Sequence, residues 1–400
     1  MNPAQSPLPS NDVLRRRALA VLPGGNTRTT VFVPPHPPYA VRGEGCEIVD
    51  ADGARVLDFL NNYTALVHGH ARPEVVQAAV GAVEDGSCFG LPTEHEIALA
   101  ERLRDRIPAA AKWRFANSGS EAVMMAIRLA RGATGRSGVV RFQGAYHGSY
   151  DAAVQPPMRG VPPSVAGEII TLPTEDGEAL ASALERHAGQ VACVLFDAMP
   201  NRAGLRPASQ EFVARLREET RRHDVLLVQD EVITLRAARG GIHSMYGIEP
   251  DIITVGKVIG GGFPIGGLGG AEELMALFDP RRPDPVIHSG TFSANPVSMR
   301  AGAVSLDLLT NERIEQINDL GDRLRLALAE RGWDVSGQGS LLQVRAPDQK
   351  RLWWALYREG LLIANNGLMC VSTAMGDAEL TRALTAFDRV AGRLRPVHSG

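Results

Sequence analysis

The sequence predicts an α/β protein in which a mostly parallel central sheet is covered by helices on both faces and a smaller α/β region completes the fold. Two observations predict this fold class. Short apolar segments typical of buried strands alternate along the chain with longer segments of helical periodicity. The chain has 400 residues, 44% of them hydrophobic, and a chain of this size can bury a large core and is expected to form two domains.

The elements are expected in a clear order. Residues 12–22 form a short helix ended by a Pro-Gly-Gly segment. A turn at residues 50–53 joins two short strands, at 47–49 and 55–57, into a hairpin. Helices then follow at residues 73–85, 95–106, 120–131 and 210–222, with strands at 114–116, 139–142, 191–196, 225–228 and 252–255. The C-terminal region adds helices at 298–309, at 313–331 and from residue 377, with strands at 341–344 and 368–372.

The composition argues against several classes of function. The formal net charge is −3, so charge does not favour binding to nucleic acid or anionic lipid. No apolar run approaches the roughly 20 residues that span a bilayer. The four cysteines have neither the spacing of a zinc site nor that of a disulfide framework, and we assign His68 and His70 to a turn, so no metal is expected. The N-terminal residues lack the apolar stretch of a signal peptide, which favours a cytoplasmic location.

A carboxylate and a lysine follow two of the predicted strands. Asp230 ends the strand that begins at residue 225, and Lys257 lies between the strand at 252–255 and a glycine cluster. Ligands of open α/β sheets bind beyond the carboxyl ends of the strands. A helix cap and a surface lysine are the alternative interpretations. As a pair, however, the two residues favour pyridoxal phosphate (PLP), with Lys257 forming the Schiff base and Asp230 keeping the pyridine nitrogen protonated.

Two further segments supply an anion site and an aromatic ring. Ser118, Gly119 and Ser120 follow a strand and open a helix, where backbone N–H groups and two hydroxyls converge. Tyr146 lies between two glycines after the next strand and is suited to stack on a planar cofactor. An ordinary helix N-cap and an ordinary core aromatic remain open as interpretations of these segments.

Together these segments resemble the class III PLP-dependent aminotransferases, and within them the branch of glutamate-1-semialdehyde aminomutase and β-phenylalanine aminotransferase. The resemblance covers about residues 22–394 and implies fold type I. It also implies a large PLP-binding domain at residues 61–300 and a small domain made of residues 1–60 and 301–400. The motifs that carry it are residues 117–122, 146–148, 230–232, 256–264 and 290–296.

The resemblance implies a role for each site residue. Lys257 would be the Schiff-base lysine and proton shuttle, and Asp230 the partner of the pyridinium nitrogen. Because this chain has the shorter acid Asp197 where Glu is usual, Asn201 is expected to take over the contact with the phenolic oxygen. The other implied cofactor contacts are Ser118, Gly119 and Ser120 at the phosphate, Tyr146 and His147 at the ring, Val232 on the ring face opposite Tyr146, and Thr291 at the phosphate of the neighbouring subunit. This last contact implies a homodimer with two shared sites.

The segment at residues 24–29 is similar to the part of β-phenylalanine aminotransferase whose arginine holds the substrate carboxylate. Arg28 is therefore the candidate for that role, because a guanidinium binds a carboxylate in a bidentate manner. The chain departs from the family pattern at Asp197-Ala198, where Glu-Pro is usual, at residues 233–236, where the aminomutase has Gly-Phe-Arg, and at residues 365–367. These departures leave the identity of the substrate open, but they do not affect the expectation that the cofactor is PLP.

We therefore expect a PLP-dependent aminotransferase that moves an amino group from a β-amino acid or an aromatic α-amino acid to a 2-oxo acid. An aminomutase of the glutamate-1-semialdehyde type, or an amino-acid racemase, would use the same Lys257 and Asp230 and stays open as an alternative. A nucleotide-binding protein is disfavoured, because the glycines have neither dinucleotide-motif nor phosphate-loop spacing.

Overall fold

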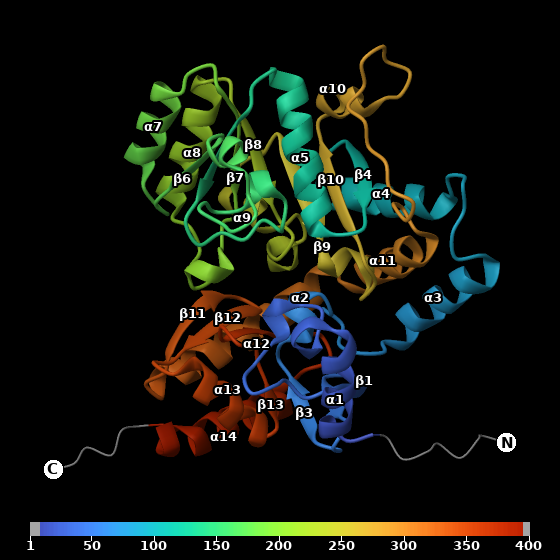
Figure 1. Ribbon diagram of the computed structural model, residues 1–400, viewed down its shortest axis with the longest axis vertical. Helices are drawn as coiled ribbons and strands as arrows, with labels where there is room; N and C mark the ends of the chain where they lie inside the picture. Colours follow the sequence, from blue (N-terminus) through green and yellow to red (C-terminus); the bar gives the residue numbers. More distant parts are fainter. Residues whose placement is uncertain (1–8, 395–400) are drawn as a thin grey trace. The chain divides into compact units, whose positions relative to one another are not determined.

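The computed structural model describes residues 9–394, which fold into two compact units (Figure 1). The larger unit runs from Pro73 to Glu315, and the smaller one combines the residues before it with those after it. The sequence places the corresponding junctions after residues 60 and 300. The boundary observed after Glu315 lies inside one continuous helix, α12 (Asn311–Glu330). The helical periodicity of the sequence therefore gives no sign of this domain boundary.

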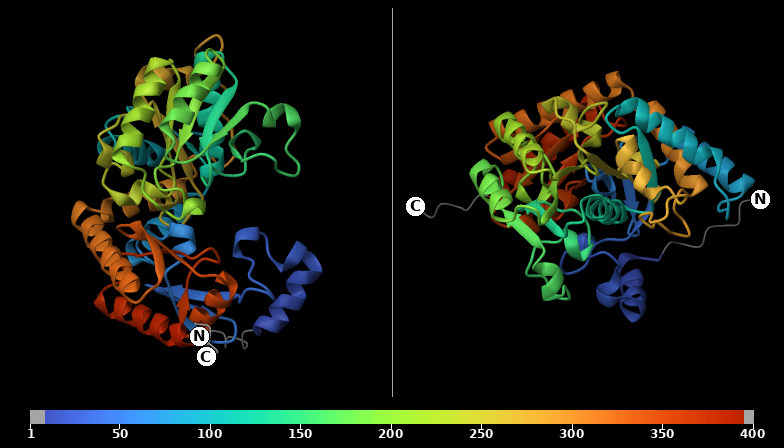
Figure 2. Two further views of the ribbon diagram at one scale, coloured as in Figure 1. Left: turned by 90° about the vertical axis from the view of Figure 1, so that its left-hand side faces the viewer. Right: turned by 90° about the horizontal axis from the view of Figure 1, so that it is seen from above.

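The larger unit is built on a seven-stranded sheet (Figures 1 and 2). One strand, β10, runs antiparallel to both of its neighbours, and the other strands are parallel to one another. In order across the sheet the strands are β4 (Lys112–Ala116), β10 (Gly266–Gly270), β9 (Ile252–Gly256), β8 (Leu226–Asp230), β7 (Val191–Phe196), β5 (Gly138–Phe142) and β6 (Ile169–Leu172). Its helices are α3 (Pro73–Asp85), α4 (Glu94–Arg106), α5 (Gly119–Thr134), α6 (Pro163–Ala166), α7 (Gly177–Arg186), α8 (Gln210–Arg222), α9 (Ile242–Tyr246), α10 (Glu272–Met275) and α11 (Pro296–Leu308).

Helices cover both faces of this sheet, as the sequence predicts. Cys193 and Leu195 of β7 belong to the apolar cluster that packs against α5. Phe196 points to the opposite face, because side chains alternate along a strand, and there its ring meets Phe212 of α8 at a centroid distance of 6.0 Å. Asp230 shares the α5 face with Val228, two residues before it. The alternation therefore directs Asp230 toward the helix whose first turn carries Ser118 and Ser120.

The strand β10 was not expected from the sequence, which shows only a glycine-rich run at residues 260–270. Its glycines allow close approach. A Cβ on Gly266 would lie 2.0 Å from the backbone oxygen of Ser118, and one on Gly269 would lie 2.7 Å from the Trp113 ring. Low strand propensity is outweighed here by pairing with both β4 and β9.

The smaller unit joins both ends of the described chain. β13 pairs in parallel with β3, and the N–H of Cys370 donates to the carbonyl of Phe59 at 2.6 Å. One of its sheets has the order β1 (Ala40–Glu44), β2 (Glu47–Asp50), β3 (Arg55–Asp58), β13 (Leu361–Leu362), and the other the order β11 (Asp334–Gln338), β12 (Leu341–Arg345), β14 (Leu368–Cys370). Its helices are α1 (Asn11–Val21), the four-residue α2 (Asn61–Thr64), α13 (Gln349–Arg358), α14 (Asp377–Leu394) and most of α12.

Candidate active site

Four strands of the larger unit bring the predicted site residues to one edge of its sheet. β4 leads into Ser118, β5 into the loop of Tyr146 and His147, and β9 into Lys257, while β8 ends at Asp230. Because these strands are parallel, their carboxyl ends lie at the same edge. Residues separated by up to 139 positions, from Ser118 to Lys257, therefore lie at one edge of the sheet.

Asp230 and His147 form a buried hydrogen-bonded pair. His147 Nδ1 lies 2.7 Å from Asp230 Oδ2, and the two side chains are 0% and 5% exposed. Oδ1 of Asp230 accepts the N–H of Val232 at 3.0 Å and the hydroxyl of Thr254 at 3.3 Å. Burial lowers the pKa of His147, and the Asp230 charge opposes that shift. The imidazole is thus neutral near pH 7 and donates its Nδ1–H to a fixed carboxylate.

The neighbouring carboxylate, Glu231, has a structural role. It lies on the opposite face of the strand and is fully buried. Its carboxylate accepts the backbone N–H groups of Ile242 and His243 at 3.0 and 2.9 Å and contacts His243 Nδ1 at 2.8 Å. Glu231 therefore anchors the start of α9, and only Asp230 of the two acids belongs to the site.

Lys257 is the first residue after β9, and its backbone is left-handed, with a φ of 49°. That conformation is unfavourable for a side chain with a Cβ and concentrates at functional positions. The residue is half-buried. Burial lowers the pKa of its amine, and the charges of Asp230 and Asp197 oppose the shift. A lowered pKa makes the neutral, nucleophilic form of the amine accessible.

Asp197 directly follows β7 and is a buried acid whose position the sequence indicated only as a family departure. Its carboxylate accepts the N–H of Met199 at 2.9 Å. Burial, followed by the negative charge of Asp230, raises the pKa of Asp197 to about 8. The two carboxylates are therefore close enough to interact, and one of them is protonated near neutral pH.

The first turn of α5 is enclosed so tightly that glycine is required around it. Ser118 caps the helix by accepting the Glu121 N–H at 3.2 Å. A Cβ on Gly148, whose φ is 94°, would lie 2.4 Å from Ser120 Oγ. One on Gly119 would lie 3.0 Å from a methyl group of Val232. The helix N-terminus and the Val232 side chain are thus in direct contact range, next to Asp230.

Tyr146 is 40% exposed, and the guanidinium of Arg202 lies 4.5 Å from the centre of its ring. Arg202 belongs to the short 3-10 helix η4 (Asn201–Ala203). The predicted contact residue Asn201 therefore lies in the segment that borders Tyr146. Arg202 is not among the residues predicted from the sequence, because no spacing pattern pairs it with a tyrosine 56 positions away.

Thr291 is exposed on the loop that precedes α11. Asn295 caps α11 by accepting the Val297 N–H at 3.0 Å, and its Nδ2 donates to the carbonyl of Ser87 at 2.8 Å. The thiol of Cys88 is 3.9 Å from the Thr291 carbonyl oxygen. The loop is therefore fastened to residues 87–88 and holds Thr291 outward.

Arg28 lies in the smaller unit. Its Nη1 donates to Asn62 Oδ1 at 2.8 Å, and its guanidinium is 6.0 Å from the centre of the Tyr63 ring. The Tyr63 hydroxyl donates to the carbonyl of Thr30. All four residues of α2 have positive φ angles, from 46° to 74°, a left-handed turn that the sequence gives no sign of.

The residues of the larger unit fit PLP. The first turn of α5 offers N–H groups and hydroxyls to a phosphate, Asp230 offers a fixed carboxylate to a ring nitrogen, and Lys257 offers an amine to an aldehyde. Comparison with known proteins agrees. The family model "Aminotransferase class-III" matches residues 32–390.

The chain belongs to the class III aminotransferases.

Individual proteins of this kind are similar along nearly the whole chain. An omega-transaminase from Sphaerobacter thermophilus is 41% identical with a TM-score of 0.93, covering 98% of this chain and 99% of that one. A transaminase solved with PLP bound has the same identity and TM-score, with 96% and 97% covered. A β-phenylalanine aminotransferase from Variovorax paradoxus is 34% identical, with a TM-score of 0.89 and 96% and 94% covered.

Curated relatives carry the name of the alternative activity. A glutamate-1-semialdehyde 2,1-aminomutase from Methanothermobacter thermautotrophicus is 38% identical over 350 residues, 84% of this chain and 83% of that protein. The resemblance to both branches is thereby confirmed, as are fold type I and PLP as the cofactor of this class III chain. The reaction outcome, transfer between two molecules or migration within one, differs between these relatives.

Two further properties concern residues 9–394. Within this part of the chain no helix combines the length and the apolar character needed to cross a membrane. The same residues contain no cluster of three or more His, Cys, Asp or Glu side chains suited to a metal ion. His70 instead contacts Asp58 at 2.7 Å and His68 contacts Thr373 at 2.9 Å.

Proposed function

We propose that this class III chain is an aminotransferase that moves an amino group from a β-amino acid or an aromatic α-amino acid to a 2-oxo acid. The observation that carries the proposal is the buried Asp230–His147 pair, which lies within electrostatic reach of the Lys257 amine. Support for transfer between molecules comes from the two transaminases that are 41% identical over nearly the entire chain.

Each residue of the site has a separate role in the proposed reaction. Bound PLP supplies an electron sink for the electrons released when a bond at the amino-bearing carbon breaks. Asp230, held by His147, Thr254 and the Val232 N–H, keeps a proton on the ring nitrogen. Lys257 Nζ, whose pKa is lowered by burial, would take the proton from the amino-bearing carbon of the substrate and return it at C4′ of the bound cofactor. Ser118 and Ser120 hold the phosphate at the first turn of α5.

The role of Lys257 is tested by Lys257→Ala and by borohydride trapping. The chain contains three lysines, Lys112, Lys257 and Lys350, so peptide mapping after reduction with bound PLP has three possible side-chain outcomes. We expect the label on Lys257 only and activity reduced by several orders of magnitude in Lys257→Ala, with Lys112→Ala as the matched control. Full activity of Lys257→Ala, or a label on another lysine, refutes the proposal.

The aminomutase is the second candidate, and the names of the curated relatives favour it. It requires the cofactor to return the amino group to the same molecule. Product formation from glutamate-1-semialdehyde without an added oxo acid would establish the aminomutase. Ketone formation from an amine donor that depends strictly on an added oxo acid would establish the aminotransferase.

Arg28 is proposed to bind the substrate carboxylate. Among residues 9–394 its guanidinium has no carboxylate partner and rests on Asn62 and the Tyr63 ring. These neutral contacts hold the side chain while leaving its charge uncompensated, which suits an anion. The 34% identical β-phenylalanine aminotransferase, which is named for a β-amino acid, supports the substrate class.

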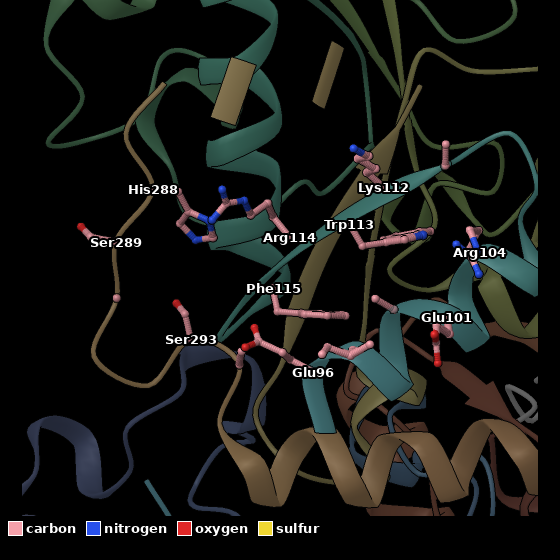
Figure 3. A pocket seen from close by; sticks show the side chains of 15 residues that line it. Glu96, Glu101, Arg104, Lys112, Trp113, Arg114, Phe115, His288, Ser289 and Ser293 are labelled. Carbon is pink, nitrogen blue, oxygen red and sulfur yellow. The ribbon is translucent and has the colours of Figure 1, made fainter. Parts of the chain in front are cut away.

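A homodimer with Thr291 contributed across the interface is proposed for the assembly. The larger unit exposes apolar side chains on α3 and α4, on the segment between them and on the loop before α11, and large exposed apolar patches mark interaction sites. A pocket of about 590 Å³ between α4, β4 and the same loop adds Trp113, Phe115 and charges of both signs (Figure 3). The exposed apolar residues are Val76, Val80, Val83, Phe89, Leu91, Ile97, Ile287 and Phe292. A second copy of the chain would cover this surface.

The cytoplasmic location expected from the sequence stays a prediction.

A further inference from the structure

A second arginine without a carboxylate partner lies at the candidate active site itself. Arg202 is exposed, and its guanidinium carbon is 4.5 Å from the centre of the Tyr146 ring. Tyr146 is followed directly by His147, whose imidazole is hydrogen-bonded to Asp230. Arg202 therefore lies beside the residue that directly precedes the buried His147–Asp230 pair in the loop after β5.

The segment that carries Arg202 is fixed at both of its ends. It begins after Asp197, whose pKa is raised by burial and, after that, by the charge of Asp230. At the other end Ala203 packs against Gly144, where a Cβ would lie 2.7 Å from the Ala203 Cβ and 3.0 Å from its backbone nitrogen. Gly144 has a φ of 73°, so the loop that leads to Tyr146 and the turn of Arg202 are locked together. Arg202 thus owes its place beside Tyr146 to backbone packing.

The charge of Arg202 is not compensated within residues 9–394, where no carboxylate forms an ion pair with it. Other arginines of the same unit are paired, such as Arg217, whose two terminal nitrogens each lie 2.9 Å from an oxygen of Asp251. The charge of Arg202 acts on another cation, Arg141. Arg141 is buried and donates only to backbone carbonyls, and burial together with the charge of Arg202 lowers the pKa of Arg141 to about 10. Two cations close together create a positive potential that favours an anion.

We propose that Arg202, as a second arginine in addition to Arg28, binds the carboxylate of the amino or oxo acid substrate. A guanidinium stacked on an aromatic ring keeps its N–H edge free, and that edge matches a carboxylate in a bidentate manner. The assignment rests on the proposed function, since it concerns the substrate of the same site. It holds for a transaminase and for an aminomutase alike, because both act on carboxylate-bearing molecules.

The first experiment measures binding without turnover. The holoenzyme is treated with the arginine reagent phenylglyoxal, alone, with pyruvate, and with acetone, which lacks only the carboxylate. Modification is mapped by mass spectrometry. We expect pyruvate to slow the modification of Arg202 several-fold and acetone to leave it unchanged, while the exposed Arg206, four residues away, reacts equally in all three. Equal modification of Arg202 with and without pyruvate overturns the proposal.

The second experiment separates substrate binding from cofactor binding. The donors 3-amino-3-phenylpropanoate and 1-phenylethylamine share the aromatic ring and the amine, and only the first has a carboxylate. Arg202→Met is expected to lower kcat/KM for the first donor at least about tenfold, the size of one hydrogen bond to a charged group, with little change for the second. Arg202→Lys should recover part of the loss, and Arg206→Met is the matched control.

The outcomes also distinguish this proposal from the general one. Equal losses for both donors together with weakened PLP binding would mean that Arg202 serves the cofactor, which overturns the proposal. Unchanged values for both donors overturn it as well. If Lys257→Ala retains activity, the proposed function fails irrespective of Arg202. If Lys257→Ala is inactive and Arg202→Met behaves like Arg206→Met, only the role of Arg202 is refuted.

Discussion

The Nδ1 atom of His147 lies 2.7 Å from the Oδ2 atom of Asp230, and both side chains are buried, with exposed fractions of 0% and 5%. The imidazole thereby fixes the carboxylate that is assigned to the cofactor nitrogen. Replacing His147 by Phe leaves Asp230 Oδ2 buried without this partner, a loss of about 1–3 kcal/mol. We expect His147→Phe to weaken PLP binding and lower kcat at least tenfold, measured by titrating the apo protein with PLP and by steady-state kinetics.

The control for this prediction is His187→Asn, a half-buried histidine at the end of α7, remote in sequence from the site. This variant should match the unchanged protein in both measurements. An unchanged PLP affinity and kcat in His147→Phe would mean that Thr254 and the Val232 N–H hold Asp230 without help.

The sequence predicts the repeating part of the fold well because apolar strands and amphipathic helices have strong periodic signals. Helices α3 and α8 and strand β7 have the predicted limits, and α5 differs from its predicted limits by no more than three residues at either end. The strand β10 gives no such signal, because its glycines are required by Ser118 and Trp113, which approach it from distant parts of the chain. Propensity is local, and these contacts are not.

For the site, sequence motifs locate Lys257, Asp230 and the first turn of α5, because each follows a recognisable strand. The arrangement between motifs is set by packing and could not be predicted. The alternation of side chains along β8 and the position of α9 decide that Asp230 belongs to the site and that Glu231 anchors α9. The placement of Arg202 on Tyr146 depends on the contact of Gly144 with Ala203.

A pair of glycine substitutions tests the enclosed first turn of α5. Gly148 and Gly160 have nearly the same φ, 94° and 96°, but a Cβ on Gly148 meets Ser120 at 2.4 Å, whereas nothing lies within 4 Å of one on Gly160. Gly160→Ala should cost only the left-handed backbone penalty, about 1–2 kcal/mol. Gly148→Ala should cost more and should also weaken PLP binding. Chemical unfolding and PLP titration of both variants check this, and equal effects of the two substitutions would contradict it.

Asp197 predicts a pH dependence of stability. Its pKa in the folded protein is about 8, above the ordinary value for an aspartate, so the folded state binds a proton that the unfolded state has released. The contribution of the protonated Asp197 to the free energy of unfolding is therefore fully present below the unfolded pKa of about 4, and it is lost as the pH rises toward 8. Asp197→Asn has no such proton to lose and keeps an oxygen for the Met199 N–H. We expect the urea midpoint of the apo protein to fall from pH 5 to 9 relative to that of Asp197→Asn, and parallel profiles would refute the assignment.

Shared active sites can be tested by complementation. If Thr291 serves the phosphate of the partner's site, Thr291→Ala and Lys257→Ala each damage both sites of a homodimer. Mixing and reassociating the two variants creates heterodimers in which one site has an intact Lys257 from one copy and an intact Thr291 from the other. We expect the activity of the mixture to exceed that of either variant alone, measured with sedimentation to confirm dimers. No gain after subunit exchange would place Thr291 outside the partner's site.

If Arg28 binds the substrate carboxylate as proposed, the left-handed turn of α2 links backbone strain to substrate selection. Asn62 has a φ of 47°, and its side-chain oxygen accepts the hydrogen bond from Arg28. Asn62→Gly keeps a residue suited to this φ and removes only the acceptor, whereas Asn62→Ala removes the acceptor and adds a backbone penalty of about 1 kcal/mol. Both should raise KM for a carboxylate-bearing donor and leave 1-phenylethylamine unaffected, because Arg28 loses the contact that orients it. Only Asn62→Ala should lower the free energy of unfolding. A KM effect confined to Asn62→Ala would show that the turn conformation, and not the Asn62 amide, positions Arg28.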